Sequence, residues 1–169
     1  ALESSGHAVT VLDLVASGFR ATMPPEERSA YHEEDGPPPV LRESIEAVRA
    51  AEALVFVYRT VATGTPPPLR GWLERVMLPG VAFVFDEQGR VRPGLTHVRA
   101  IIGIATYSAP WHRVKWEHDH GRRVLLRALR LNTGLRTRTR WVAAYGADAI
   151  DAVGRTRFLA RIETAVSAL

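Results

Sequence analysis

The sequence predicts one α/β domain, residues 1–169, with a parallel β-sheet covered by helices on both faces. Two mostly apolar runs, residues 53–58 and 98–106, have the composition of parallel strands that are buried on both sides. Amphipathic stretches, in which apolar residues recur every three or four positions, lie between and after these runs. Strands that alternate with helices build parallel sheets flanked by helices.

The remaining elements follow from the same patterns and from Pro- and Gly-rich breaks. The expected strands lie at residues 8–14, 53–58, 98–106 and 137–145, and the expected helices at 40–52, 68–78, 121–132 and around Phe158, Ile162, Val166 and Leu169. Residues 81–89 form a small excursion, and residues 15–39 and 107–120 are expected loops. Ligands of such sheets bind beyond the carboxyl ends of the strands. We therefore expect the site in the loops at residues 59–68, 106–120 and 145–151.

The composition is that of a soluble domain. Of the 169 residues, 46% are hydrophobic and 24% charged, and no apolar run approaches the roughly 20 residues of a membrane helix. Residues 1–20 lack the pattern of a signal peptide, so we expect a cytoplasmic protein without membrane insertion. Cysteine is absent, which excludes disulfides and thiol nucleophiles.

The basic residues do not indicate a nucleic-acid partner. The net charge is +4, and Lys115 is the only lysine. The arginines alternate with acidic residues along most of the chain, and the dense stretch at residues 136–140 has the period of a solvated strand face. Nucleic-acid binding is therefore not expected.

A longer motif connects the chain to a known family. Between residues 58 and 83 it fixes Gly64, Pro66, Leu69, Gly71, Trp72, Arg75 and Val76 at set spacing, and further matches lie at Pro93-Gly94-Leu95, Ala105-Thr106 and Asp119-x-Gly121-Arg122. This pattern resembles the flavodoxin-fold NAD(P)H:quinone oxidoreductases. The resemblance implies a flavodoxin-like fold, FMN or FAD as cofactor, NAD(P)H as reductant, a small quinone-like acceptor and a homodimer.

The resemblance also implies which loops hold the flavin. Its binding residues would be Thr60, Val61, Ala62, Thr63 and Gly64 in a first loop and Thr106, Tyr107 and Ser108 in a second. Five positions depart from the family: Arg59 replaces a proline, Val61 and Ala62 replace two tryptophans, and Tyr107 and Ser108 replace two glycines. Restoring tryptophan at 61 and 62 and glycine at 107 and 108 is expected to strengthen flavin binding.

The N-terminal residues resemble the end of a helix, because Gly6 suits the left-handed position that closes one. In the related family a strand and a phosphate-binding loop precede this helix. We therefore expect about 20–40 further residues before Ala1, with the first strand of the sheet missing from this sequence.

Several side chains near the expected loops are candidates for chemistry. We expect His112, His118 and Tyr107 to act as acid–base groups, since histidine titrates near neutrality. The candidate substrate contacts are Arg59, Trp111, Trp116, Tyr31 and His32. Histidines and acidic residues cluster at 112–120, but their spacing fixes no third ligand, so no metal is expected.

Three functions remain open at this point. The first is a flavin-dependent NAD(P)H oxidoreductase for quinone-like acceptors. The second is an enzyme of the same fold that has lost flavin and acts without redox chemistry on a small, polycyclic metabolite. The third is a non-catalytic regulatory subunit.

Overall fold

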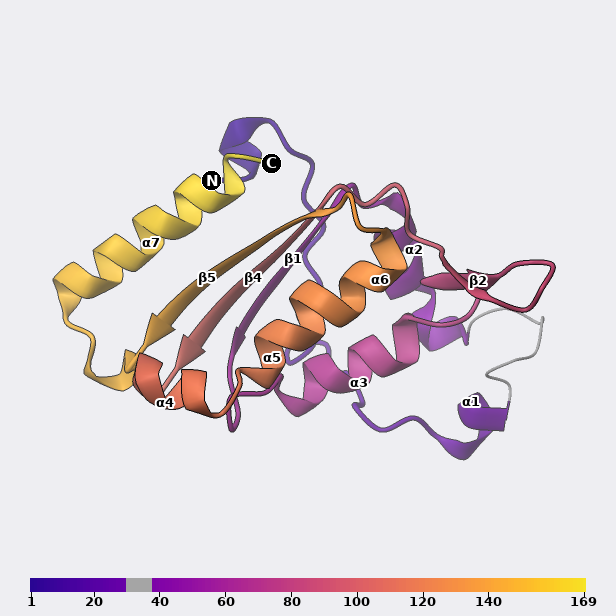
Figure 1. Ribbon diagram of the computed structural model, residues 1–169, viewed down its shortest axis with the longest axis horizontal. Helices are drawn as coiled ribbons and strands as arrows, with labels where there is room; N and C mark the ends of the chain where they lie inside the picture. Colours follow the sequence, from indigo (N-terminus) through magenta and orange to yellow (C-terminus); the bar gives the residue numbers. More distant parts are fainter. Residues whose placement is uncertain (30–37) are drawn as a thin grey trace.

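The computed structural model describes residues 1–29 and 38–169 (Figure 1). Its centre is a parallel sheet in the order β1-β4-β5, built from β1 (Ala53–Arg59), β4 (Ala100–Tyr107) and β5 (Arg138–Tyr145). The three strands run in register, with Arg59 opposite Thr106 and Tyr107 opposite Tyr145. The predicted α/β fold is confirmed, and the three carboxyl ends share one edge of the sheet.

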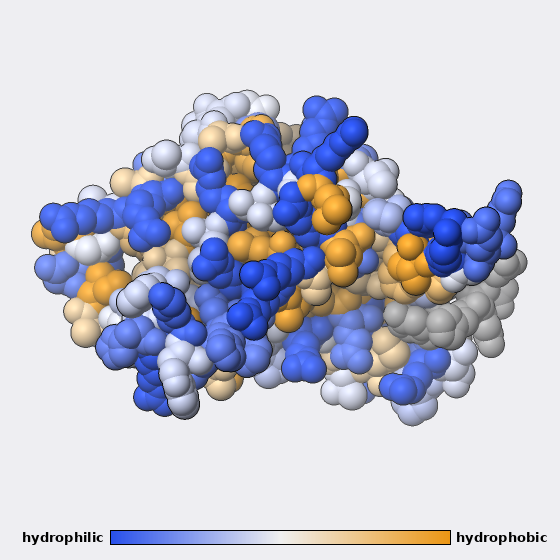
Figure 2. Space-filling view, in the orientation of Figure 1, coloured by the Kyte–Doolittle hydropathy of each residue, from blue (hydrophilic) through white to orange (hydrophobic). Residues whose placement is uncertain are grey.

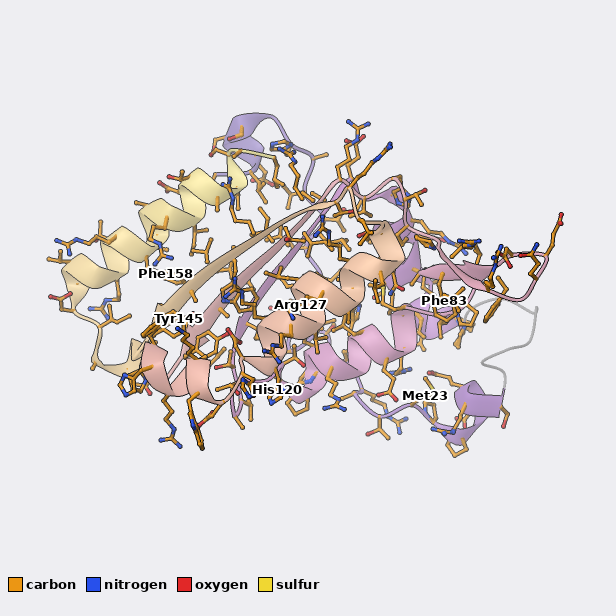
Figure 3. All side chains as sticks on the ribbon, in the orientation of Figure 1. Met23, Phe83, His120, Arg127, Tyr145 and Phe158 are labelled. Carbon is orange, nitrogen blue, oxygen red and sulfur yellow. The ribbon has the colours of Figure 1, made fainter. Side chains whose placement is uncertain are left out.

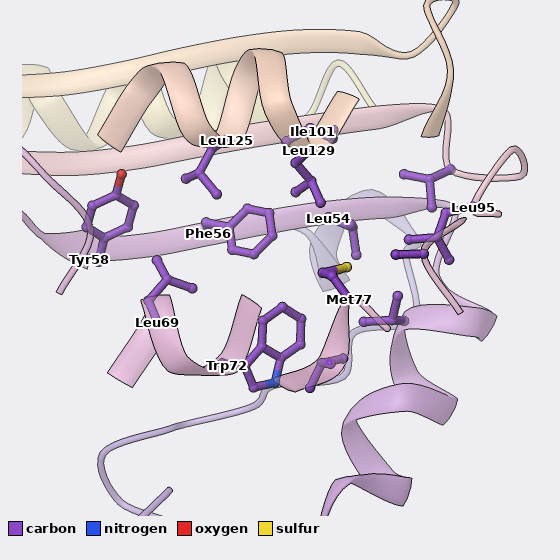
Figure 4. Close-up of a cluster of buried hydrophobic side chains, with 14 of the residues drawn as sticks. Leu54, Phe56, Tyr58, Leu69, Trp72, Met77, Leu95, Ile101, Leu125 and Leu129 are labelled. Atoms are coloured by element: carbon purple, nitrogen blue, oxygen red, sulfur yellow. The ribbon is translucent and has the colours of Figure 1, made fainter. Parts of the chain in front are cut away.

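One face of the sheet carries the main core. It is covered by α2 (Arg42–Ala50), α3 (Pro67–Val76), and a helix that runs from α5 (His120–Arg123) through one π turn (Val124–Ala128) into α6 (Leu129–Thr133). The core side chains shown in Figure 4 include Leu54, Phe56, Leu69, Trp72, Leu125 and Leu129, all buried. On the solvent side, Figure 2 shows hydrophilic side chains interspersed with apolar ones over this face.

The opposite face packs against α7 (Ala152–Val166), which is the predicted C-terminal helix. Arg138 and Arg140 of β5 reach the carboxyl end of this helix, where Arg140 donates to the carbonyls of Thr164 and Ala165, both at 3.3 Å. The last carbonyls of a helix lack partners within it and carry partial negative charge. The arginine alternation therefore caps α7, where the sequence suggested only a solvated strand face.

The motif on α3 docks three different neighbours. A Cβ atom on Gly71 would lie 2.1 Å from the backbone oxygen of Ala21, so only glycine allows this approach. The indole N–H of Trp72 donates to Ser44 Oγ at 3.0 Å. Arg75 forms a bidentate ion pair with Glu27, in which Nε lies 2.8 Å from Oε2. The motif thus fixes α2 and the segment at residues 20–27.

Smaller elements lie around the sheet. A 3₁₀ turn, Glu3–Ser5, closes at Gly6 with φ 84°, as predicted for a helix end. The other small elements are α1 (Pro25–Ser29), a 3₁₀ turn Pro39–Leu41, the hairpin of β2 (Phe83–Phe85) and β3 (Val91–Pro93), α4 (Trp111–Trp116) and a 3₁₀ turn Ala147–Ala149. None of the helices in the described residues has the length and apolar character needed to cross a membrane.

The predicted strand at residues 8–14 is wrong. Leu12 and Leu14 pack against the core, but Val11 is 80% exposed and the segment joins no ladder. A strand needs a neighbouring strand to pair its backbone N–H and C=O groups. Within residues 1–29 and 38–169, β1 is an edge strand, and no strand lies between it and residues 8–14 to pair with them. The expectation of a strand before Ala1 stays a prediction.

Two further sequence predictions need correction. Residues 107–120 contain the short helix α4, although the sequence suggested only a loop. The sequence pattern of the predicted helix 121–132 places Val124, Leu125, Ala128 and Leu129 on its inward face. In the structure Leu125 and Leu129 are buried, whereas Val124 and Ala128 are exposed. Leu125 and Leu129 lie four residues apart on one face of the helix, whereas Val124 and Ala128 each lie one position earlier and therefore on a neighbouring, exposed face.

Candidate functional site

The candidate site lies at the edge where the three strands end. Figure 3 shows Tyr145 at the end of β5 and His120 at the start of α5 on this side of the molecule. The backbone N–H and the hydroxyl of Thr60 both donate to the carbonyl of Thr106, each at 3.0 Å. These two bonds hold the loops after β1 and β4 side by side.

The first loop is a tight two-residue turn. Val61 and Gly64 exchange backbone hydrogen bonds of 3.2 and 2.8 Å, and between them Ala62 and Thr63 have φ values of 45° and 58°. Two left-handed residues inside such a pair are the geometry of a type I′ turn, which rarely accommodates side chains other than those of Gly, Asn and Asp. The N–H groups of Ala62 and Thr63 have no hydrogen-bond partner among the described residues.

The second loop offers donors of the same kind. The N–H groups of Ser108 and Ala109 make no hydrogen bond within the described part of the chain. The carbonyl of Ala109 accepts from the N–H of Gly146 at 3.0 Å, which ties the third loop to the second. The two adjoining loops thus have four backbone N–H groups without a partner among the described residues, on the exposed Ala62 and Ser108, the half-buried Ala109 and the buried Thr63.

These donors fit a flavin in part. A flavin ring has carbonyl and nitrogen acceptors along one edge, which backbone N–H groups can bind and orient. The side-chain wall fits less well, because Val61 is 56% exposed and Ala62 is also exposed, and neither offers the area of a tryptophan. The site therefore retains the donors and lacks the aromatic wall.

Arg59 lies where all three loops meet. Its Nη2 donates to Ser108 Oγ at 2.8 Å and lies 3.3 Å from Asp148 Oδ1. The Arg59 and Asp148 side chains are 67% and 64% exposed, so the cation stays accessible to solvent. The structure thus brings Arg59 and Ser108 together at the predicted place, whereas Asp148 was not among the residues expected from the sequence.

Tyr107 is turned away from the loop surface. It is 1% exposed, its hydroxyl donates to Asp119 Oδ1 at 2.6 Å, and its ring stacks on Tyr145 with centroids 5.0 Å apart. Burial, and then the Asp119 hydrogen bond, raise the pKa of Tyr107 well above its ordinary value. The structure thus places the Tyr107 side chain in the core and not at the loop surface, where the sequence analysis expected an acid–base or ligand-contacting group.

The remaining predicted residues lie on α4 and after it. Trp111 and Trp116 are 56% and 81% exposed, and Lys115 Nζ lies 5.0 Å from the centre of the Trp111 ring. The exposed imidazoles of His112 and His118 make no hydrogen bond to any described residue. The residues 1–29 and 38–169 contain no group of three or more His, Asp or Glu side chains that could hold a metal ion. Tyr31 and His32 lie outside the described residues.

The sequence analysis noted Asp119 as part of the family pattern and of the cluster of histidines and acidic residues at 112–120. It caps α5 with its own φ at 43°, and its Oδ1 accepts from the backbone N–H of Arg122 at 3.4 Å as well as from Tyr107. An aspartate directly before a helix is a known capping signal and could have identified this role. The bond to Tyr107 has no sequence signal.

The family model described as "Flavodoxin-like fold" matches residues 1–161. The chain belongs to the flavodoxin-like fold family. A search of curated proteins finds no significant match.

Several solved structures of this fold are similar to the chain. The NAD(P)H:quinone oxidoreductase from Methanothermobacter marburgensis is 22% identical, with a TM-score of 0.84 over 98% of this chain and 84% of the other. Smu.1420 from Streptococcus mutans UA159 is 18% identical, with a TM-score of 0.81 over 96% and 84%. An FMN-dependent NADH-azoreductase from Bacillus anthracis, in complex with FMN, is 16% identical, with a TM-score of 0.65 over 96% and 76%. At these identities the likeness establishes the flavodoxin-like fold.

Proposed function

We propose that this flavodoxin-like protein is a flavin-dependent NAD(P)H oxidoreductase that reduces quinone-like acceptors. The observation that carries the proposal is the set of four backbone donors, on Ala62, Thr63, Ser108 and Ala109, at the adjoining ends of β1 and β4. The quinone oxidoreductase and the FMN-bound azoreductase of the same fold support it. A bound FMN or FAD supplies the hydride and two-electron chemistry that protein side chains lack.

The chain's own groups would orient the reactants. The four N–H dipoles would fix the ring edge and favour negative charge on it, as preorganised donors do. Arg59, exposed at the junction of the loops, would attract anionic groups of NAD(P)H or of the acceptor. Trp111 and Trp116 would contact the acceptor, and the exposed His112 or His118 would supply a proton to it. In this proposal the protein is a homodimer, as the resemblance implies, and it is cytoplasmic, as expected from the sequence.

Flavin titration tests the proposal. Purified protein is mixed with FMN or FAD, and flavin fluorescence and NAD(P)H oxidation with a soluble naphthoquinone are followed. We expect binding at a Kd on the order of 1 μM or tighter, about −8 kcal/mol. The double variant V61W/A62W should bind about tenfold more tightly, because aromatic contacts contribute roughly 0.5–1.5 kcal/mol beyond the area that they bury.

The matched control is V57W. Val57 is 73% exposed on β1, two residues before the site, so a tryptophan there adds the same side chain outside the loops. Its flavin affinity should equal that of the wild type. A wild-type protein that binds neither FMN nor FAD refutes the proposal.

One observation favours a second function. The small, exposed side chains of Val61 and Ala62 leave the site open where the family has an aromatic wall. An enzyme without flavin could then act on a small metabolite with Arg59, His112 and His118 as polar groups. In that case the protein binds no flavin, and a metabolite raises its melting temperature while R59M abolishes the effect.

A further inference from the structure

A strained backbone segment in the first loop lies next to a second one that directly precedes α5. One is the left-handed pair Ala62 and Thr63, and the other is the pair His118 and Asp119, with φ values of 66° and 43°. The N–H of Gly121 donates to the carbonyl of Thr63 at 3.0 Å, and Thr63 itself is only 5% exposed. The first loop therefore rests on the start of α5.

Gly121 lets this contact form. A Cβ atom at this position would lie 3.2 Å from both Thr63 O and the carbonyl carbon of Gly64, and 2.9 Å from the hydroxyl of Tyr58. These distances are tighter than real side chains normally show, and two of the three contacts are with backbone atoms. The position of α5 therefore fixes the position of the loop.

Asp119 in turn fixes the start of α5. Its carboxylate accepts from Tyr107 and from the N–H of Arg122, and its own N–H donates to the carbonyl of Val114 at 3.2 Å. A left-handed residue other than glycine is strained and persists only where its surroundings hold it. The hydroxyl of Tyr107 supplies that hold from inside the core, where the ring is clamped by burial and by Tyr145.

We propose that the Tyr107–Asp119 hydrogen bond positions residues 60–64, so that Tyr107 supports the ligand-binding loop from beneath. The connection runs from Tyr107 to Asp119, through the backbone of Gly121, to Thr63 and its exposed neighbour Ala62. Tyr107 stands where the resemblance places a glycine, and its side chain occupies the core rather than the ligand space. The ligand part of this inference rests on the proposed function, whereas the loop part does not.

This reverses one expectation from the sequence. Glycine at position 107 should weaken flavin binding, because it removes the support of the loop together with the stacked ring. The substitutions V61W and A62W are therefore expected to strengthen flavin binding, whereas Y107G is expected to weaken it.

Amide hydrogen exchange tests the loop directly. The probes are the N–H groups of Gly64 and Gly121, which bond Val61 O and Thr63 O. In Y107F and D119A both amides should exchange about tenfold faster than in the wild type, the effect of losing one buried hydrogen bond. Amides of Ile102 and Ile104 in the sheet interior should be unchanged, which shows that the fold is intact.

Two matched variants separate positioning from general loosening. D119N retains an oxygen that accepts from Tyr107, so its exchange rates should return to those of the wild type. Y145F removes a hydroxyl from the ring that stacks on Tyr107 and leaves the Asp119 bond in place, so it should also match the wild type. Equal exchange at Gly64 and Gly121 in D119A and wild type, or equal acceleration in D119N and D119A, overturns the inference.

Flavin titration adds the ligand readout. Y107F and Y107G should each weaken FMN binding by about tenfold or more. Tighter FMN binding by Y107G than by the wild type contradicts the inference, even if the proposed function holds. If the wild type binds no flavin, the proposed function fails and the exchange rates still decide whether Tyr107 positions the loop.

Discussion

The chain contains two ion pairs of the same chemistry and opposite burial, which allows a sharp comparison. The Arg75–Glu27 pair has side chains that are 4% and 10% exposed, whereas those of Arg59 and Asp148 are 67% and 64% exposed. In E27A the partners that remain for the buried guanidinium among the described residues are the carbonyl of Arg20 and the face of the Phe19 ring, 4.9 Å away. Breaking a buried pair costs about 3–5 kcal/mol, whereas an exposed pair contributes about 0–1 kcal/mol.

Urea unfolding followed by tryptophan fluorescence measures both. We expect E27A to lose about 3 kcal/mol or more, which lowers the melting temperature by roughly 6–12 °C for a domain of this size. D148A should lose less than about 1 kcal/mol. The double variant R75M/E27M should recover part of the loss, because no buried charge then remains unpaired. Equal losses in E27A and D148A would show that the segment at residues 19–29 does not dock on α3 as described.

Two further predictions follow from the core. Burial, and then the charge of Asp119, raise the pKa of Tyr58, and burial also raises that of Tyr107, above the ordinary 10.0. The folded state therefore keeps protons that the unfolded state releases, so the urea midpoint should fall as pH rises beyond about 10, and the fall should be shallower in Y58F. A urea midpoint that does not change with pH contradicts the burial of the two tyrosines. A Cβ atom on Gly103 would lie 2.1 Å from the Trp141 ring, so G103A should lower the free energy of unfolding in urea by about 1–3 kcal/mol. The double variant G103A/W141L should recover part of this loss. A G103A variant as stable as the wild type would show that the ring moves aside without cost.

The central strands were predictable because their signal is local. Residues 53–58 and 98–106 are apolar runs, and that composition identifies strands of a parallel sheet. The structure buries β4 on both faces, whereas β1 is buried mainly on one face and leaves Val57 73% exposed on the other. Residues 8–14 instead alternate between apolar and other residues, and Leu12 and Leu14 pack against the core. The segment nevertheless forms no strand. Ladder formation depends on a neighbouring strand, which is a property of the whole sheet and not of the segment. In this segment the alternation coincides with the partly buried side chains of Leu12 and Leu14, but it does not predict the hydrogen bonds.

Short and strained elements were the least predictable. Helix α4 spans six residues with Val114 as its only buried side chain, so it shows no helical period. The left-handed pairs at Ala62–Thr63 and His118–Asp119 contain no glycine, the residue that normally marks such turns. They exist because Gly121 and Asp119 hold them through contacts between residues far apart in the chain.

The site combines groups that tolerate substitution with groups that do not. Backbone N–H donors are supplied by every residue except proline, so replacing tryptophans with Val61 and Ala62 leaves the donor set intact. The aromatic wall depends on the side chains themselves and is lost with the same replacements. Departures from a family motif at such positions therefore predict weaker stacking and a more open pocket, with the orienting donors unchanged. For this reason V61W/A62W is expected to tighten flavin binding without any change in the turn that presents the donors.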